Sequence, residues 1–331
     1  MTAHPLVSVV IPTYNRVATI TRALDSVIRQ SHRPLEIIVV DDGSTDDTLG
    51  TIDHDGCAVP LTVISLGHNE GAAAARNHGI TLARGDFVAF LDSDDEWEPD
   101  KIAKQLAALE AAGLEYGASY TGIASYAEDG KLCAVSRAVE GGDLRRALLN
   151  HNLVGSTSCM LARRTLLQQI GGFDRSLASC QDWDLWIRLA GHTRFVCVPE
   201  PLTHVHVARE GRISTNGHAR LSGYRQLYRT HLRGPFKAGQ VDSALFRTNL
   251  GEIFMQLDRP GYARRQFAAL WRAKPWSAKR LTLLALARFG TGKARYFRIA
   301  ARLERLEARL RPSPIASPSG LAVVGQPGRR P

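Results

Sequence analysis

Short apolar runs alternate with segments of helical periodicity along the first hundred residues. The runs are continuous and rich in Val and Ile, as expected of strands that are buried on both faces. The segments between them repeat apolar residues every three or four positions, which is typical of a helix with one buried face. The predicted strands are Val7–Pro12, Leu35–Val40, Leu61–Leu66 and Asp86–Leu91. The predicted helices are Val17–Ile28, Thr45–Ile52, Gly71–Ala83 and Pro99–Ala112. This order predicts an α/β fold with a mostly parallel sheet flanked by helices.

The pattern changes further along the chain. The elements expected after residue 150 are a loop and helix within Gly155–Ile170, a helix at Asp182–Ala190, and strands at Thr193–Val198 and Leu202–Val207. From about residue 214 the periodicity is only helical, and the last stretch is rich in Pro, Ser and Gly. We therefore expect three parts: an α/β domain over residues 1–213, an all-helical extension over 214–311 and a disordered tail over 312–331.

Composition narrows the class of protein. No apolar run reaches the roughly 18 residues that a membrane span requires. The first residues lack the basic start and the small-residue cleavage site of an export signal. The five cysteines lie singly, without the pairs of a zinc site or the even count of a disulfide framework. We therefore expect a protein of the reducing cytoplasm.

Charge divides the chain in two. Residues 1–200 contain 17 Lys and Arg against 26 Asp and Glu, whereas residues 201–331 contain 25 against 6. The acidic part favours a cation or metal, and the basic part favours an anionic partner. Nucleic acid is not the expected partner, because the basic residues are spread over helices without aromatic stacking motifs.

A basic amphipathic helix is expected near the end of the extension. Between residues 293 and 311 an apolar stripe repeats every three or four positions and is surrounded by Lys and Arg. Such a helix can lie on an anionic membrane, which would make the protein peripheral on the cytoplasmic face. It can also pack on the α/β domain or on a second subunit with its arginines in water, and both alternatives stay open.

Two predicted strands end in clusters of acidic residues. The run DDGSTDD (41–47) follows one strand, and DSDD (92–95) follows another. Ligands of open parallel sheets bind beyond the carboxyl ends of the strands, so both clusters are expected at the site. Because like charges repel, groups that are positive or donate hydrogen bonds are expected between them. Helix capping is the alternative, but it explains only one acid per loop.

The spacing Asp92-x-Asp94 suits a hard divalent cation. Mg²⁺ or Mn²⁺ is typically held by one or two carboxylates, while substrate phosphates complete the coordination shell. A diphosphate ligand is therefore implied, with the metal stabilising a departing diphosphate. His206 is a candidate further ligand, although a single His more often packs or faces solvent.

Six sequence blocks follow one another in order between residue 7 and about residue 207. They are VSVVIPTYNR (7–16), VVDDGSTDDT (39–48), NEGAAAARNHGI (69–80), GDFVAFLDSDDEWEPDKI (85–102), GGFDRSL (171–177) and QDWDLWIRLA (181–190). Together they resemble the signature of family 2 glycosyltransferases. The resemblance implies a GT-A fold, a nucleoside-diphosphate sugar donor such as a UDP-sugar, Mg²⁺ or Mn²⁺, and transfer with inversion. It also implies a saccharide or lipid-linked acceptor in the assembly of bacterial cell-surface polysaccharide or glycolipid.

The resemblance assigns roles residue by residue. The residues expected to bind the nucleotide sugar are Pro12, Thr13, Tyr14, Asp41, Arg76, Asp92 and Ser93. Among these, Asp41 would accept a hydrogen bond from the base and Arg76 would lie against the base or the diphosphate. The residues expected to hold the metal are Asp94 and Asp92, with Asp95 and His206 as weaker candidates.

Asp182 is the candidate general base, which would take the proton of the acceptor hydroxyl. At about 100° of rotation per residue, Asp182 falls within the apolar arc of its helix. Because burial disfavours the charged form, the pKa of Asp182 should rise. Asp184 and Arg188 share the polar side four residues apart and are expected to form a surface ion pair. The alternative role of Asp182 is an N-terminal cap. The family more often has Glu where this chain has Gln181, so this chain lacks the charge that the family has beside the base.

The sequence also bears on two other classes of protein. A catalytically inactive protein that binds a nucleotide sugar for regulation or scaffolding is the alternative, and the presence of Asp94 and Asp182 argues against it. A dinucleotide-dependent dehydrogenase is excluded because no GxGxxG motif follows the first strand.

Overall fold

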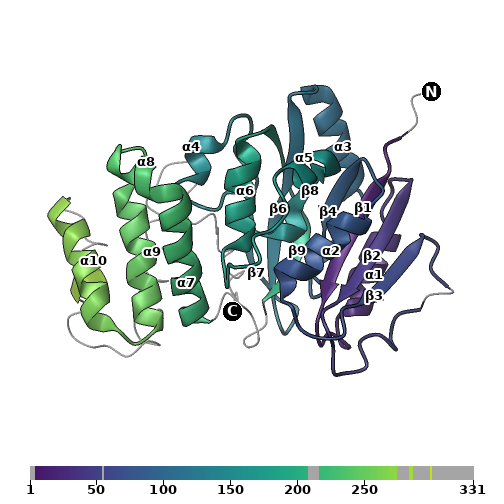
Figure 1. Cartoon of the computed structure of the whole chain (residues 1–331), viewed down its shortest axis with the longest axis horizontal. Coiled ribbons are helices and arrows are strands. Elements are labelled where there is room, and N and C mark those ends of the chain that lie inside the picture. Colours follow the sequence, from purple (N-terminus) through teal and green to yellow (C-terminus); the bar gives the residue numbers. More distant parts are fainter. Residues whose placement is uncertain (1–3, 54–55, 208–215, 274–282, 286–298, 300–331) are drawn as a thin grey trace, which may run out of the picture.

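The computed structural model describes residues 4–53, 56–207, 216–273, 283–285 and 299. Figure 1 shows a sheet with its covering helices and, beside it, a further group of helices. The strands are β1 (Val7–Thr13), β2 (Leu35–Asp41), β3 (Leu61–Ser65), β4 (Phe87–Phe90), β5 (Glu96–Trp97), β6 (Tyr116–Ala127), β7 (Leu132–Ser136), β8 (Met160–Arg163) and β9 (Arg194–Val207).

The helices fall into two groups along the chain. Those of the α/β part are α1 (Ile20–Ile28), α2 (Ala72–Leu82), α3 (Lys101–Ala112), α4 (Arg145–Leu148), α5 (Arg164–Gln169) and α6 (Gln181–Ala190), with the 3-10 turn η1 (Thr157–Cys159). Those that follow are α7 (Gly217–Leu227), the π-helical turn η3 (Tyr228–Leu232), α8 (Arg233–Lys237), α9 (Ser243–Gln256) and α10 (Pro260–Ala273).

The sheet has a parallel half and a mixed half. Its strand order is β3-β2-β1-β4-β8-β6-β9-β5, and β7 pairs with β6. The strands β1 to β4 pair in parallel, whereas β8 is antiparallel to both β4 and β6. The parallel half brings the carboxyl ends of β1, β2 and β4 to one edge. The predicted α/β fold is confirmed, and the second half of the sheet is more mixed than predicted because β7 and β8 pair antiparallel to their neighbours.

Three predicted elements differ from the structure. The helix predicted at Thr45–Ile52 is wrong, since the segment forms bends and turns. Its backbone N–H groups bond to side chains: Thr45 donates to Asn15 and Thr48 donates to Asp46, which competes with helix formation. The segment Gly155–Ile170 contains the strand β8, which was not predicted. The two last predicted strands are one continuous strand, β9.

Side chains of the sheet alternate between two cores. In β1, Val10 faces a core that includes residues of α2, α5 and α6, whereas Val9 and Ile11 face a core shared with α1 and α3. All three are fully buried. This alternation explains why the strand reads as a continuous apolar run, since each face of the sheet is covered by helices.

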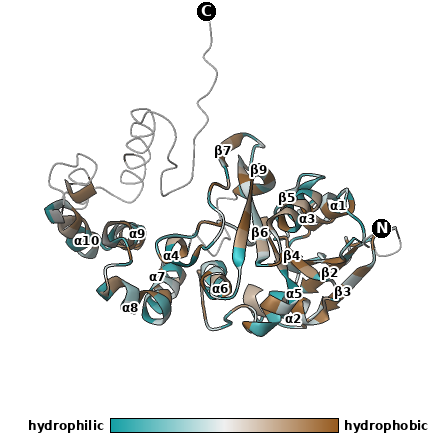
Figure 2. Ribbon diagram, turned by 90° about the horizontal axis from the view of Figure 1, so that it is seen from above, coloured by the Kyte–Doolittle hydropathy of each residue, from teal (hydrophilic) through white to brown (hydrophobic). Residues whose placement is uncertain are grey.

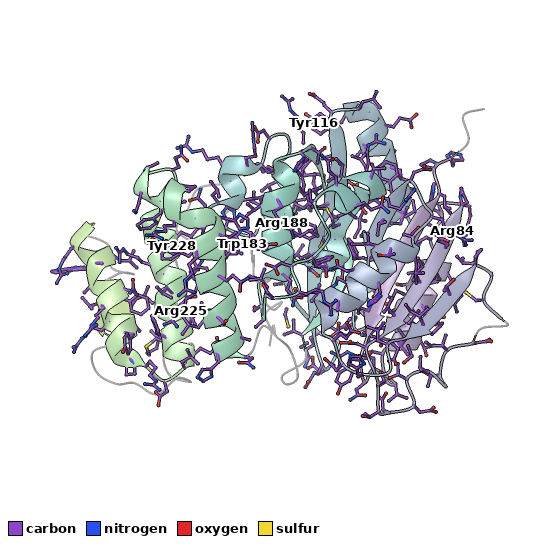
Figure 3. The ribbon with its side chains drawn as sticks, viewed as in Figure 1. Arg84, Tyr116, Trp183, Arg188, Arg225 and Tyr228 are labelled. Carbon is purple, nitrogen blue, oxygen red and sulfur yellow. The ribbon has the colours of Figure 1, made fainter. Side chains whose placement is uncertain are left out.

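The helices after β9 pack against α6 on its side away from the sheet (Figure 2). Trp183 of α6 lies between the two groups of helices (Figure 3) and joins a cluster with Tyr224, Leu227 and Ile253. The helical character predicted after residue 214 is confirmed for residues 217–237, 243–256 and 260–273. The predicted basic helix at 293–311 and the predicted tail lie outside the described residues, apart from residue 299 in the helix. Among the described residues, no helix is long and apolar enough to cross a membrane.

The core on α6 gives a stability prediction. Leu189 is 0% exposed and Leu114 is 90% exposed, so the same truncation should have different effects at the two positions. We expect Leu189→Ala to lower the free energy of unfolding by about 2–5 kcal/mol and Leu114→Ala to change it by less than about 0.5 kcal/mol. Urea unfolding measures both values. Equal values for the two variants would contradict the described packing of α6.

Candidate active site

A cavity of about 710 Å³ opens at the carboxyl ends of β1 and β4. Its walls come from residues within the segments 12–16, 69–76, 92–95, 155–157 and 179–182, together with residue 42. The structure thus brings together most of the residues that the sequence singles out: Pro12, Thr13, Tyr14, Arg76, Asp92, Ser93, Asp94, Asp95 and Asp182. Two candidates, Asp41 and His206, do not line this cavity.

The two adjacent acids after β2 have different positions. Asp41 is buried, and its carboxylate accepts hydrogen bonds from the Ser44 N–H (3.2 Å) and the Ser65 hydroxyl (2.9 Å). Asp42 lines the cavity and accepts from the N–H groups of Glu70 (2.7 Å) and Gly71 (2.9 Å), at the start of α2. The base-binding role of Asp41 stays a prediction. Asp42 belongs to the acidic run that the sequence places at the site, although the sequence assigns it no role of its own.

Positive charges lie beside the second acid cluster, as predicted. The Arg76 guanidinium is 2.6 Å from Asp92 Oδ1 and stacks on the Phe173 ring at 5.3 Å from its centroid. Thr157 donates its hydroxyl to both oxygens of Asp92 at 3.1 Å. Arg16 is 3.7 Å from Asp94 Oδ2. These donors offset the repulsion between the carboxylates.

Asp94 and Asp95 face different surroundings. The Asp94 side chain is 25% exposed at the cavity wall. Asp95 is buried and accepts a hydrogen bond of 2.6 Å from the Ser158 hydroxyl, which itself accepts from the Asp92 N–H. Over the described ranges, no group of three or more His, Cys, Asp and Glu side chains is arranged to hold a metal ion. The carboxylates of Asp92 and Asp94 still fit a cation whose other ligands are phosphate oxygens.

His206 lies on β9, and its Nε2 is 2.8 Å from Glu96 Oε1. Its ring stacks on Tyr126 with 5.7 Å between the centroids. The metal-binding role of His206 stays a prediction.

A buried layer supports the acidic segment after β4. Lys101 is fully buried, with its Nζ 4.1 Å from the centroid of the Trp97 ring and 2.7 Å from Gln105 Oε1. Trp97 donates from Nε1 to the Ser158 carbonyl at 2.8 Å. Because the Ser158 hydroxyl bonds to the Asp92 N–H and to the Asp95 carboxylate, this layer holds both ends of the acidic segment in place. Burial lowers the pKa of Lys101 to about 7.

Asp182 lies in the first turn of α6, and its half-buried side chain lines the cavity. Asn152 donates from Nδ2 to Asp182 Oδ2 at 2.7 Å. Burial raises the pKa of Asp182 above its ordinary value, although the Trp183 N–H, Asn152 and Arg76 act in the opposite direction. This direction agrees with the sequence prediction, and a carboxylate of raised pKa suits proton transfer.

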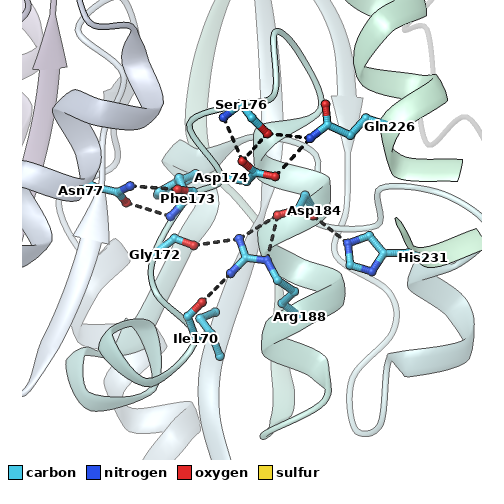
Figure 4. Close-up of polar contacts among 10 residues, drawn as sticks. All are labelled: Asn77, Ile170, Gly172, Phe173, Asp174, Ser176, Asp184, Arg188, Gln226 and His231. Atoms are coloured by element: carbon cyan, nitrogen blue, oxygen red, sulfur yellow. Dashed lines mark hydrogen bonds and ion pairs between the residues drawn. The ribbon is translucent and has the colours of Figure 1, made fainter. Parts of the chain in front are cut away.

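The ion pair predicted between Asp184 and Arg188 is present, but its placement on the surface is wrong, because Asp184 is buried and Arg188 is half-buried. Asp184 is 4% exposed; Arg188 contacts its Oδ2 at 2.7 Å, and His231 contacts its Oδ1 at 2.7 Å (Figure 4). Burial alone would raise the pKa of Asp184, but His231 and Arg188 lower it below its ordinary value. The helices after β9 cover this face of α6, which the pattern of α6 alone does not indicate.

Three site residues were missed by the sequence analysis. Asn152 holds Asp182, Thr157 holds Asp92, and Ser158 holds both ends of the acidic segment. For Thr157 and Ser158 the available signal was the polar run GSTS (155–158), since Ser and Thr in a loop often bond to neighbouring groups.

The buried lysine gives a pH prediction. A Lys with a lowered pKa binds its proton less tightly in the folded chain, so between pH 7 and 10.5 the unfolded chain holds more protons. Wild-type stability should therefore rise with pH in this window, by about 3 kcal/mol between pH 7 and pH 10 relative to Lys101→Met. Urea unfolding at both pH values tests this, with the exposed Lys237→Met as the control. A wild-type protein and a Lys101→Met variant with the same pH dependence would contradict it.

Comparison with known proteins identifies the family. Residues 8–171 match the sequence profile described as "Glycosyl transferase family 2". A Bacillus subtilis protein named "Putative teichuronic acid biosynthesis glycosyltransferase TuaG" is 37% identical over 188 residues, which are 56% of this chain and 72% of that protein.

Solved structures share the fold at low sequence identity. TarS 1-349 of S. aureus, in complex with UDP-GlcNAc, matches with a TM-score of 0.58 and 20% identity over 91% of this chain and 92% of that chain. Mannosyltransferase PcManGT of Pyrobaculum calidifontis, in complex with GDP-Man and Mn²⁺, matches with a TM-score of 0.58 and 22% identity over 93% and 89%. The chain belongs to glycosyl transferase family 2 and has the GT-A fold that its sequence blocks imply.

Proposed function

We propose that the protein is an inverting glycosyltransferase that moves a sugar from a nucleoside diphosphate, UDP in the simplest case, to an acceptor hydroxyl. The observation that carries the proposal is one cavity that contains both a carboxylate of raised pKa, Asp182, and the acidic pair Asp92 and Asp94. The first group suits proton transfer from an acceptor, and the second suits a cation-bound diphosphate.

The donor would lie between the end of β1 and the acidic segment after β4. A cavity of about 710 Å³ is within the usual range for small-molecule sites. Arg76 and Arg16 provide permanent positive charge next to Asp92 and Asp94, where a diphosphate would add negative charge. TarS and PcManGT, which were solved with UDP-GlcNAc and GDP-Man, support a nucleotide-sugar donor.

Asp94 would be the principal ligand of Mg²⁺ or Mn²⁺, and Asp92 the second. The exposed part of Asp94 at the cavity wall and the oxygen chemistry of both side chains fit such a cation. When bound, the cation supplies positive charge that stabilises the leaving diphosphate. The complex of PcManGT with Mn²⁺ supports this cofactor.

Asp182 would act as the general base. Its carboxylate accepts the proton of the acceptor hydroxyl as that oxygen bonds to the sugar carbon and the bond to the diphosphate breaks. A single displacement from the opposite side inverts the configuration. Asn152 orients the carboxylate through Oδ2, and burial raises its affinity for the proton.

The acceptor and the location are further parts of the proposal. The name of TuaG supports an acceptor in cell-surface polysaccharide assembly, either a saccharide or a lipid-linked saccharide. We propose a cytoplasmic protein with peripheral contact to anionic membrane. On α10 the exposed side chains are aromatic and basic, which supports such contact: Tyr262, Arg264, Arg265, Trp271 and Arg272.

Asp182→Asn should bind the donor and lose transfer. The amide keeps the shape of the side chain but has little affinity for a proton, so the transfer rate should fall by about 10²–10⁴-fold. Calorimetry with the nucleoside diphosphate and Mn²⁺ should give wild-type affinity. Asp129→Asn, on an exposed turn, is the control. Transfer within a few-fold of wild type, or no donor turnover by the wild-type protein with any nucleotide sugar and Mn²⁺, would refute the proposed mechanism.

Asp94→Ala should act at the binding step. Without this carboxylate, the affinity for the nucleoside diphosphate in the presence of Mn²⁺ should fall by at least about 10-fold, while the weaker affinity without metal should change little. Calorimetry with and without Mn²⁺ separates the two effects, and Asp129→Ala serves as the control. Unchanged affinity in Mn²⁺ would rule out Asp94 as a metal ligand.

A further inference from the structure

The segment that carries Asp182 lies between the cavity and helix α7. Ser179, Cys180, Gln181 and Asp182 line the cavity. On its other side, α7 passes so close that a Cβ at Gly223 would overlap the carbonyl oxygen of Ser179. A backbone carbonyl cannot rotate away as a long side chain can, so any larger residue must move either α7 or the cavity wall.

A second contact from α7 holds the loop before α6. Gln226 donates from Nε2 to the Ser176 hydroxyl at 2.7 Å and to Asp174 Oδ2 at 3.3 Å. From the opposite side, Asn77 of α2 donates to the Phe173 carbonyl and accepts from the Phe173 N–H, both at 2.8 Å. Figure 4 shows the loop between these two groups. Helix α2 on one side and helix α7 on the other therefore fix the position of this loop together.

A third contact anchors α6 itself. His231 Nε2 is 2.7 Å from Asp184 Oδ1, and the two side chains are 14% and 5% exposed. Arg188 bonds to the other oxygen and donates to the carbonyl of Gly172 at 2.7 Å. Since Asp182 and Asp184 belong to the same turn of α6, these contacts of Asp184 constrain the rotation of the helix that aims Asp182 at the cavity.

The hydrogen-bond partner of Asp182 is supported from the same group of helices. Asn152 belongs to the loop after α4, and the Asp242 N–H at the start of α9 donates to Asn150 of that loop at 2.5 Å. Trp183 donates to the Leu148 carbonyl at 2.6 Å and lies 6.1 Å from the Tyr224 ring. The helix that carries Asp182 and the loop that carries its partner Asn152 thus both contact the helices after β9.

We propose that Gly223 and His231 are positioning residues for glycosyl transfer, which act by setting the place and direction of Asp182. The inference rests on the proposed role of Asp182 as general base. The donor-binding groups belong to β1, to α2 and to the segments directly after β1 and β4, so a shift of α7 should change the chemical step more than donor binding. A misplacement of about 1 Å can cost on the order of 100-fold in rate.

The first test compares Gly223→Ala with Gly234→Ala in the full-length protein. Both replace a helical glycine, but an added Cβ at Gly234 meets nothing within 4 Å. The donor probe is the sugar nucleotide that gives the largest thermal shift in a panel of UDP- and GDP-sugars with Mn²⁺. We expect Gly223→Ala to lower kcat for nucleoside-diphosphate release by about 10–100-fold, while the Kd of the nucleoside diphosphate stays within about 3-fold. Gly234→Ala should match wild type in both.

The second test uses His231. Replacement by Ala removes the contact with Asp184, whereas Gln can place an amide N–H near the same carboxylate oxygen. We expect His231→Ala to lower kcat without changing the Kd of the nucleoside diphosphate, and His231→Gln to restore at least about half of the lost activation free energy. A residue that only stabilised the fold would not show this split between kcat and Kd.

Hydrogen exchange gives a readout that needs no donor. In Gly223→Ala and His231→Ala, amides of residues 177–190 should exchange faster than in wild type, while those of residues 85–97 should not. Wild-type kcat in both variants, or unchanged exchange at 177–190 in both, would overturn the inference. These results differ from failure of the proposed function, which would appear as an active Asp182→Asn variant.

Discussion

Repulsion between carboxylates at one edge of the sheet is the constraint on which the site depends. Parallel strands deliver Asp41, Asp42 and Asp92 to this edge, where their charges would disfavour the folded state if nothing opposed them. The chain supplies donors of three kinds. Backbone N–H groups bond to Asp42, hydroxyls bond to Asp41 and Asp95, and Arg76 bonds to Asp92. The loops around the cavity therefore have the shapes that these hydrogen bonds require.

The same requirement explains a local departure from the sequence pattern. After β2 the chain has helical periodicity, but Asn15 adopts a left-handed backbone conformation with φ of 53° and accepts from the Thr45 N–H. Asp46 accepts from the N–H groups of Val17 and Thr48. These bonds tie two loops of the cavity together and leave fewer N–H groups for a helix, so the segment stays in turns. Here side-chain acceptors outweigh helical propensity.

Local patterns in the sequence were sufficient for the four strands of the parallel half of the sheet and for most of the cavity. Continuous apolar runs located β1, β2 and β4, and the acids that follow two of them marked the cavity. The residues that escaped prediction depend on partners far along the chain. Asn152 bonds to a residue 30 positions away, and His231 bonds to Asp184 across 47 positions. Neither Asn152 nor His231 belongs to a periodic pattern that would indicate which way its side chain points. Only the tertiary structure brings these partners together.

Two carboxylates of α6 show how one helical turn can hold groups of opposite behaviour. Asp182 faces the cavity, where burial raises its pKa and Asn152 offers one neutral donor. Asp184 faces the helices after β9, where His231 and Arg188 keep its pKa low. Arg188 and His231 anchor the helix through Asp184. A cation as close to Asp182 as Arg188 is to Asp184 would lower the proton affinity of Asp182. The helices that cover α6 thus stabilise the turn through Asp184 and leave Asp182 in surroundings that suit a base.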